Sequence, residues 1–567
     1  MDNHSPKSDA INRRSLLTQG AALMGGAAAR LALGAGNASA EERPKTGAQP
    51  AAKPATAVEP PNLHPPVVQV RGGRLRGFKD GKTFTFLGVP YAEAERFEMP
   101  KPVQAWEGIK SAQAWGPVCP IPQAITVGGD EFVFPHRYWV DNEHCQVLNI
   151  WTQNPAAKTK KPVMVWMHGG GFTNGSSMES YAYDGKTLSE FGDVVAVSLN
   201  HRLNVIGTLD LSAYGPEYAN SRNTGMADLV AALQWIHENI EAFGGDPASV
   251  TIFGQSGGGG KVTRLMHMPA AKGLFHKVIC ESGSTVNYRD TDPAKIIQSQ
   301  QAVAAETLRN LGLDGSRIDK LKKVPYHDLL AAGNAANQVV AKQAGTQRMG
   351  WDPIADDQYV LREFCDWADS IPYIAGTVMT EFSSNMAKGE LTKNEWSQKE
   401  IDERLTAAFG DKKGEIVAEF KKFQPNKKIQ DALFLDNRFR LGAKTMLAQK
   451  LEKSKVPVYN YIFTYEYPVN GGVTAFHTAE IAFAFHALSE PHIRIATGGG
   501  PSALALQEKV SQAWVNFART GNPSQPGLAW KPYTLAGKET MVFDTVSEVR
   551  SVDDDKLLSL LPQDRRG

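Results

Sequence analysis

Short runs of consecutive apolar residues alternate with segments of helical spacing between Val67 and about Ser284. The strand-like runs lie at 162–167, 194–199, 250–253 and 278–280. Between the second and third runs, apolar residues recur every three to four positions, which predicts a helix over 227–243. Strands that are apolar throughout and separated by helices indicate a mostly parallel sheet covered on both faces.

Two later stretches, about 293–346 and 395–453, have helical spacing with polar faces. We expect them to form helical excursions on top of the sheet. Strand character returns at 456–465. The pattern favours one domain over 66–567 rather than two.

The N-terminal segment is typical of a targeting signal. Arg13 and Arg14 precede a small-residue apolar run over about 21–35, and an A-x-A site ends at Ala40. The paired arginines make the segment resemble a twin-arginine export signal over 1–40, cleaved after Ala40. A membrane anchor is disfavoured because the run is short, glycine-rich and interrupted by Arg30. We expect a periplasmic or secreted protein without stable membrane insertion, and a flexible Pro/Ala-rich linker over 41–65.

Composition excludes several classes of function. The chain has 567 residues, of which 42% are hydrophobic and 21% charged, and its net charge is +1. This balance is ordinary for a globular enzyme, and it argues against a nucleic-acid-binding surface. The four cysteines lack zinc-site spacing, so no metal and no organic cofactor is implied. One of them, Cys280, lies in an apolar strand-like run and is interpreted as a buried small hydrophobe.

The pentapeptide Gly254-Gln255-Ser256-Gly257-Gly258 directly follows the apolar run 249–253. A strand that ends in G-x-S-x-G and opens a helix is how an α/β-hydrolase exposes a nucleophilic serine. Glycines flank the serine because the turn is too sharp for larger side chains. Ser256 is therefore the candidate nucleophile.

A serine nucleophile also needs donors for the oxyanion that forms on attack. His168 is followed by three glycines and Phe172, directly after the strand-like run that ends at Met167. Lipases and esterases place an oxyanion loop at this position. We expect the backbone amides of Gly170, Gly171 and Gly257 to form the oxyanion hole.

With these motifs in place, the chain resembles the type-B carboxylesterase/lipase family, which includes bacterial para-nitrobenzyl esterases. The resemblance covers nearly all of residues 67–545. Its further motifs are GVPYA at 88–92, RF at 96–97, NEHC at 142–145, LNIW at 148–151, NHRL at 200–203, NIEAFGGDP at 239–247, ESGS at 281–284 and FARTGNP at 517–523. The resemblance implies an α/β-hydrolase fold, with a mostly parallel sheet flanked by helices.

The resemblance also supplies partners for Ser256. The family's acid follows G-x-x-x-x-E, which ends here at Glu381, and its base stands in H-x-x-E-I, which begins here at His477. Ser282 resembles a serine near that acid, and Glu480 is expected to support the loop. The alternative base is His486, whose apolar surroundings are more typical of a core histidine.

Other matches imply structural roles. The family has an N-terminal disulfide, which would join Cys119 to Cys145 here. Buried ion pairs are implied for Arg96 with Glu143 and for Arg202 with Asp228. No chemistry is expected from His168 or His201, and Cys365 receives no assignment.

Two positions depart from the family pattern, which has Glu before the nucleophile and Ala after it. Gln255 removes a negative charge beside the histidine, so we expect a poor fit to cationic, choline-like esters. Gly257 is expected to change little, because its role is to supply a backbone amide.

Together these observations predict a serine carboxylic-ester hydrolase that forms an acyl-enzyme on Ser256 and acts on a small-molecule ester. The alternative is a specialised hydrolase of a lipid, carbamate, aromatic polyester, toxin ester or acylated glycan. A non-catalytic binding protein on the same fold is a further alternative. It is disfavoured because every catalytic part is present.

Overall fold

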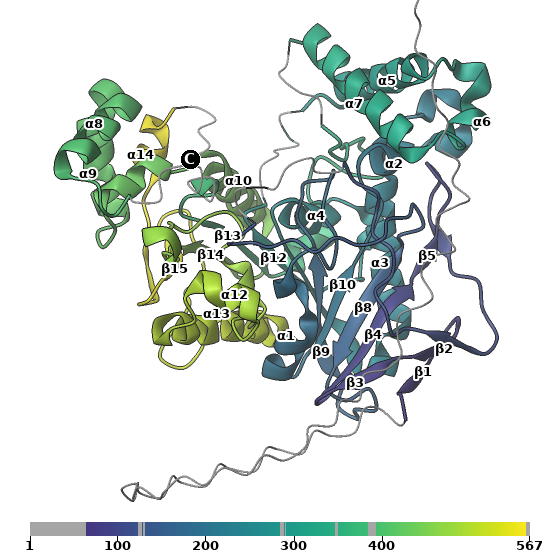
Figure 1. The fold of residues 1–567 in the computed structure, drawn as a ribbon, viewed down its shortest axis with the longest axis horizontal. Helices are drawn as coiled ribbons and strands as arrows, with labels where there is room; N and C mark the ends of the chain where they lie inside the picture. The colour runs from purple at the N-terminus through teal and green to yellow at the C-terminus, as the bar shows by residue number, and fades with distance from the viewer. Residues whose placement is uncertain are drawn as a thin grey trace, which may run out of the picture. The chain divides into compact units, whose positions relative to one another are not determined.

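A large twisted sheet occupies the centre of the computed structural model (Figure 1). The structure describes residues 64–122, 128, 131–283, 289, 291–345, 350–383 and 393–562. In spatial order the strands of this sheet are β16 (Glu548–Ser551), β15 (Glu539–Phe543), β14 (Val458–Phe463), β13 (Tyr373–Val378), β12 (Lys277–Glu281), β11 (Gly245–Gln255), β9 (Lys161–Met167), β10 (Val195–Leu199), β8 (Val147–Thr152), β4 (Thr83–Pro90) and β3 (Phe78–Asp80). The proposed signal over 1–40 and nearly all of the linker lie outside the described residues.

The middle of the sheet is parallel, as predicted. Every neighbouring pair from β10 through β9, β11, β12, β13 and β14 to β15 is parallel, whereas β16, β8, β4 and β3 pair antiparallel at the edges. Parallel strands end at the same edge of a sheet, so the segments that follow β11, β13 and β14 meet there. This edge carries the candidate site.

The helices are α1 (Gly185–Gly192), α2 (Asn204–Thr208), α3 (Thr224–Asn239), α4 (Gly257–Leu265), α5 (Pro293–Asn310), α6 (Ile318–Leu321), α7 (Tyr326–Gln343), α8 (Gln398–Phe409), α9 (Lys413–Phe423), α10 (Arg438–Lys453), α11 (Ile481–Ala484), α12 (Pro491–Thr497), α13 (Pro501–Thr520) and α14 (Asp555–Leu560). Smaller sheets join β1 (Val67–Val70), β2 (Gly73–Arg76) and β7 (Ile109–Ser111), and β5 (Ala92–Glu93) with β6 (Lys101–Pro102). None of the described helices is both long and apolar enough to span a bilayer.

Alternate residues of the central strands pack on opposite faces, which is why the strands are apolar throughout. Trp166 of β9 joins a cluster with residues of α1 and α13. Its neighbour Val165 joins a second cluster with residues of α3, α4 and α10. Both faces are thus covered by helices, and the predicted α/β-hydrolase fold is confirmed.

Local differences from the predicted elements have clear causes. The strand expected over 250–253 begins earlier, at Gly245, because Gly245 pairs with Lys161 before a register shift that ends at Val250. The helix expected over 227–243 is α3, which continues into a 3₁₀ turn over Ile240–Phe243. The left-handed Gly244 (φ 81°) ends that turn.

The two predicted helical excursions are present. The first contains α5 and α7, which pack against each other, and the second contains α8 and α9 (Figure 1). The second also supplies α10, whose inner face packs on β13 and β14.

Candidate active site

Ser256 occupies the sharp turn between β11 and α4. Its backbone has φ 57° and ψ −123°, a conformation that a non-glycine residue rarely adopts. The Ser256 amide donates to the carbonyl oxygen of Glu281 at the end of β12 (2.8 Å), and the Gly260 amide donates to the Ser256 carbonyl oxygen (2.9 Å). The turn is therefore anchored on both sides, and the serine is left half-buried at the edge of the sheet.

The predicted oxyanion glycines lie against this turn. Gly170 has φ 78°, and a Cβ there would lie 2.4 Å from the carbonyl oxygen of Asn174. A Cβ at the neighbouring Gly169 would lie 3.5 Å from the Cβ of Ser256. A Cβ at Gly171 would meet no atom within 4 Å, so this part of the loop borders open space next to the serine.

The structure corrects the expectation that Gly257 changes little. A Cβ at this position would lie 2.2 Å from the carbonyl oxygen of Gly171 and 2.5 Å from its nitrogen. An alanine would therefore force the oxyanion loop away from the nucleophile turn. Glycine at 257 permits a closer approach of the two segments than the family's usual alanine would.

Glu381 and His477 are brought together from two loops at the same edge. Glu381 lies shortly after β13, and His477 lies between β14 and α11. His477 Nδ1 lies 2.5 Å from Glu381 Oε2, and the His477 amide donates to the Glu381 carbonyl oxygen. The Thr380 amide also donates to the Ala475 carbonyl oxygen (3.1 Å), which ties the two loops together.

Burial governs the electrostatics of this pair. It lowers the pKa of His477 to about 4, against the charges of Glu480 and Asp436, which raise it. It raises the pKa of Glu381, against hydrogen bonds from the Ser282 side chain and the Val378 amide. A neutral imidazole is thus favoured at neutral pH, and a neutral imidazole can accept a proton.

Sequence reasoning missed the groups that surround the histidine. Phe382 stacks on the His477 ring at 5.3 Å between centroids, and Phe439 of α10 lies at 5.0 Å. Asp436, just before α10, is buried; burial first and the Glu381 charge second raise its pKa to about 7. The position of Phe382 next to Glu381 was the only local signal, because Phe439 and Asp436 reach the site through the helical excursion.

A buried cluster of carboxyl groups lies behind the pair. The Ser282 hydroxyl contacts both Glu381 and Glu480, the latter at 3.5 Å. Trp514 of α13 donates to Glu281 (2.8 Å), whose pKa is raised by burial and by the charge of Glu480. Ser282 thus links Glu381, the predicted acid, to Glu480.

Gln255, the last residue of β11, is fully buried. A Cβ built at Gly169 would lie 3.5 Å from its Oε1 atom, so the side chain lies under the oxyanion loop. Its Nε2 atom has no hydrogen-bond partner among the described residues.

The predicted disulfide is corrected. Cys119 and Cys145 are both buried free thiols. Cys119 Sγ accepts from the Leu203 amide (3.2 Å), and burial together with a hydrogen bond between the two thiols raises the pKa of Cys145. Cys280 is buried on β12, as predicted.

His486 is not the core histidine that its sequence surroundings indicate. Its ring is partly exposed, stacks on Phe191 at 4.2 Å and pairs through Nε2 with Glu508 (2.8 Å). His168 and His201 are both buried, and their ring centroids lie 5.4 Å apart.

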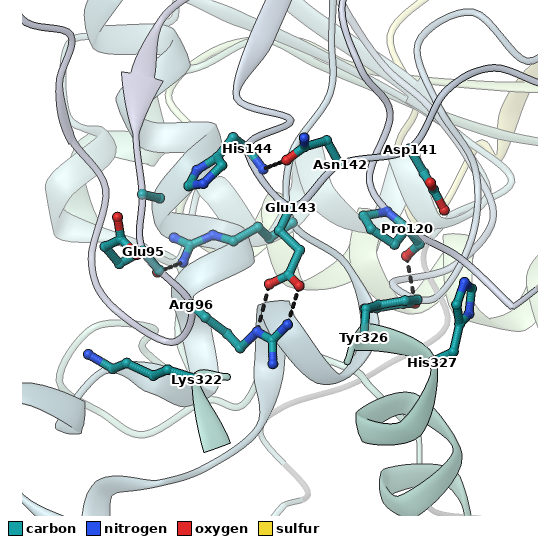
Figure 2. A pocket seen from close by; sticks show the side chains of 12 residues that line it. Glu95, Arg96, Pro120, Asp141, Asn142, Glu143, His144, Lys322, Tyr326 and His327 are labelled. Atoms are coloured by element: carbon teal, nitrogen blue, oxygen red, sulfur yellow. Dashed lines mark hydrogen bonds and ion pairs between the residues drawn. The ribbon is translucent and has the colours of Figure 1, made fainter. Parts of the chain in front are cut away.

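Both predicted ion pairs are present. Arg202 and Asp228 are fully buried and joined by two side-chain contacts of 2.7 and 2.9 Å. Arg96 forms a two-pronged contact with Glu143 in a hollow of about 400 Å³ (Figure 2). Arg96 also donates to the carbonyl oxygens of Leu321 (3.0 Å) and Val324 (2.7 Å), so it joins two segments of the chain and has the expected structural role. No cluster of three or more potential metal ligands occurs among the described residues.

Comparison with known proteins identifies the relatives of this arrangement. Residues 64–556 match the family described as "Carboxylesterase family". The chain belongs to this family. It is a carboxylic-ester hydrolase with the α/β-hydrolase fold.

Individual carboxylesterase relatives match over nearly their whole length. The chain is 30% identical to the para-nitrobenzyl esterase of Bacillus subtilis over 491 residues, which cover 84% of this chain and 95% of that one. It is also 30% identical to the fumonisin B1 esterase of Sphingopyxis macrogoltabida, with 84% and 86% covered. A solved esterase from Clostridium hathewayi, described as able to hydrolyse aliphatic aromatic polyesters, is 40% identical with a TM-score of 0.81, and the match covers 89% of this chain and 99% of that one.

Proposed function

We propose that this carboxylesterase works by two-step acyl transfer on Ser256. His477 takes the proton from Ser256 as its oxygen attacks the ester carbonyl, and Glu381 orients the imidazole and stabilises the imidazolium. The amides of Gly170, Gly171 and Gly257 hold the oxyanion. The alcohol leaves with a proton from His477, and water then attacks the acyl-enzyme with His477 as base.

One observation carries the proposal. It is the 2.5 Å contact of Glu381 with His477, which joins the loops that follow β13 and β14. Glu381 follows β13 and His477 follows β14, and both strands end at the edge of the sheet where Ser256 follows β11. A non-catalytic protein has no need for this pair or for the strain at Ser256, so the binding-protein alternative is disfavoured.

Trapping the acyl-enzyme tests the mechanism. After a rapid acid quench during turnover of a p-nitrophenyl ester, mass spectrometry should find the acyl group on the peptide that contains Ser256. A burst of p-nitrophenol should match the amount of enzyme. Acylation at any other residue would overturn the assignment.

The aromatic side chains beside His477 favour a second, narrower candidate within the same chemistry. Phe382 and Phe439 contact the His477 ring, and the Clostridium hathewayi esterase is described as able to hydrolyse aliphatic aromatic polyesters. We propose aromatic diesters as a substrate class, with aliphatic short-chain esters as the alternative. In steady-state kinetics, a soluble terephthalate diester should give a higher kcat/KM than an aliphatic ester of similar size. The reverse ranking would reject this candidate.

Gln255 gives a pH prediction. The Gln255→Glu variant adds a carboxylate that favours the imidazolium and raises the pKa of His477. Only neutral His477 can accept the Ser256 proton. As pH falls, the variant should therefore lose activity at a higher pH than the wild type does. We expect the acid limb of kcat/KM to move up by about one pH unit, and choline esters to gain relative to neutral isosteres.

The pH–rate profile of kcat/KM, with Gln255→Met as the uncharged control, measures this shift. An acid limb that moves equally in both variants, or in neither, contradicts the electrostatic role of position 255.

We also propose that the chain is exported by a twin-arginine signal over 1–40, with a linker over 41–65 before the catalytic domain. The arginine pair and the A-x-A site support this. The exported protein should begin at Glu41 by N-terminal mass spectrometry. Replacing both Arg13 and Arg14 with Lys should leave full-length precursor inside the cell, and undiminished export of that variant would refute the proposal.

A further inference from the structure

Lys261 is a fully buried lysine on α4, one and a half turns after the nucleophile. Its charge interacts with that of the carboxyl group of Glu179, whose pKa is itself raised by burial. Burying a charged group costs free energy, and burial lowers the pKa of Lys261 to about 7, even though the charge of Glu179 raises it. Such a side chain is retained at a cost, which calls for a role in the region it contacts.

Its hydrogen bond and its ring contact both lie on the oxyanion loop. Lys261 Nζ donates a hydrogen bond to the carbonyl oxygen of His168, the residue that begins the loop (2.9 Å). The same atom lies 5.6 Å from the ring centre of Phe172, the residue that ends it. Arg264, one turn later on α4, places its guanidinium 4.6 Å from the same ring. The helix that begins at the nucleophile thus holds both ends of the glycine loop.

This contact fixes a geometry that the loop cannot fix for itself. Glycines restrict the backbone weakly, so Gly169, Gly170 and Gly171 can take several orientations. The His168 carbonyl belongs to the peptide unit that precedes these glycines, and holding it toward α4 sets the direction in which the following amides point. The close approach at Gly257 keeps that direction aligned with Ser256.

We propose that Lys261 is a positioning residue for the oxyanion hole, which links the loop to the nucleophile helix through the His168 carbonyl. The proposal rests on the acyl-transfer mechanism above. It assigns Lys261 no contact with substrate. Its effect falls on the transition state, because the loop amides bind the oxyanion more strongly than the ground-state carbonyl.

The test compares the variants Lys261→Met, Lys261→Arg and Lys450→Met. Each is purified as the full-length enzyme and assayed with a p-nitrophenyl ester. Lys450 is the matched control, because it is also buried and donates to a backbone carbonyl, that of Ala368 (2.7 Å), far along the chain on α10. We expect Lys261→Met to lower kcat roughly 10- to 100-fold with KM changed less than about twofold, somewhat less than loss of a whole oxyanion donor. Lys261→Arg should restore most of kcat, and Lys450→Met should lower Tm without lowering kcat.

A second measurement separates the proposed effect on the oxyanion hole from a general loss of stability. Binding of a trifluoromethyl ketone, which imitates the tetrahedral oxyanion, should weaken in Lys261→Met by the same factor as kcat/KM. If Lys261→Met does not fold, Lys261→Gln is measured in its place with the same expectations. Unchanged kcat, or equal losses of kcat in the Lys261 and Lys450 variants, overturns the proposal. Acylation of Ser256 in the wild-type enzyme is scored separately, so the proposal can fail while the mechanism stands.

Discussion

Ser256→Ala is expected to lower kcat for a p-nitrophenyl ester by about 10⁶-fold and to leave no trapped acyl-enzyme. The hydroxyl is the only group at the turn that can form the covalent intermediate. The oxyanion amides and the Glu381–His477 pair remain in this variant, so a small residual rate over water is expected. Steady-state rates at high enzyme concentration, together with the acid-quench assay, measure both effects.

Folding is the control for this result. The hydrogen bonds that anchor Ser256 to Glu281 and Gly260 use its backbone atoms, so circular dichroism and Tm should match the wild type within error. As a comparison, Ser511→Ala removes the hydroxyl of a buried serine on α13, which donates to the Phe483 carbonyl of α11 (2.6 Å). That variant should lose about 1 kcal/mol of stability but keep its activity. Retained turnover in a folded Ser256→Ala protein would remove Ser256 from the mechanism.

Glu381→Gln is expected to lower kcat by about 10³- to 10⁴-fold with little change in KM. The amide keeps the shape of the carboxylate but removes its charge, so it no longer stabilises the imidazolium. Its NH₂ group can also face His477 Nδ1 and favour the wrong tautomer of the ring. Stopped-flow measurement of the burst separates this loss in the acylation step from any change in substrate binding.

The chain contains its own matched control, the contact of Glu508 with His486 Nε2 at 2.8 Å. Glu508→Gln removes the carboxylate from that second Glu–His pair, which lies near the surface. Its kcat should equal the wild-type value. Similar losses in both variants would mean that general charge effects, and not the position of Glu381, explain the result.

Sequence reasoning reached the fold because its signals are local. Apolar runs separated by helical spacing are sufficient for a parallel sheet, because both faces of each central strand must be buried. The nucleophile turn and the glycine loop are readable for a related reason. Their steric demands fall on neighbouring residues, such as the glycines around Ser256, and those residue types stand side by side in the chain.

The partners of Ser256 came from the family resemblance and not from local pattern. Glu381 and His477 are 96 residues apart, and one glutamate among many carries no local mark of its role. Only the order β11, β12, β13, β14 places the ends of these strands together. The same holds for Phe439, which enters from the excursion that ends in α10.

Three features were decided by the tertiary structure alone. Cys119 and Cys145 are buried thiols with hydrogen-bond partners, which cysteine spacing does not reveal. Gly257 permits a close approach that depends on the backbone of Gly171. Lys261 bonds a carbonyl 93 residues away, although in the sequence it is an ordinary lysine after four glycines.

The sequence by itself thus determined the strand and helix order, the turn at Ser256 and the glycine loop, because each depends on adjacent residues. The tertiary structure decided how closely the loop lies to the nucleophile, what surrounds His477 and where the buried charges stand. These features depend on distances between segments that meet only when the sheet is assembled, and no local pattern of residues encodes such distances.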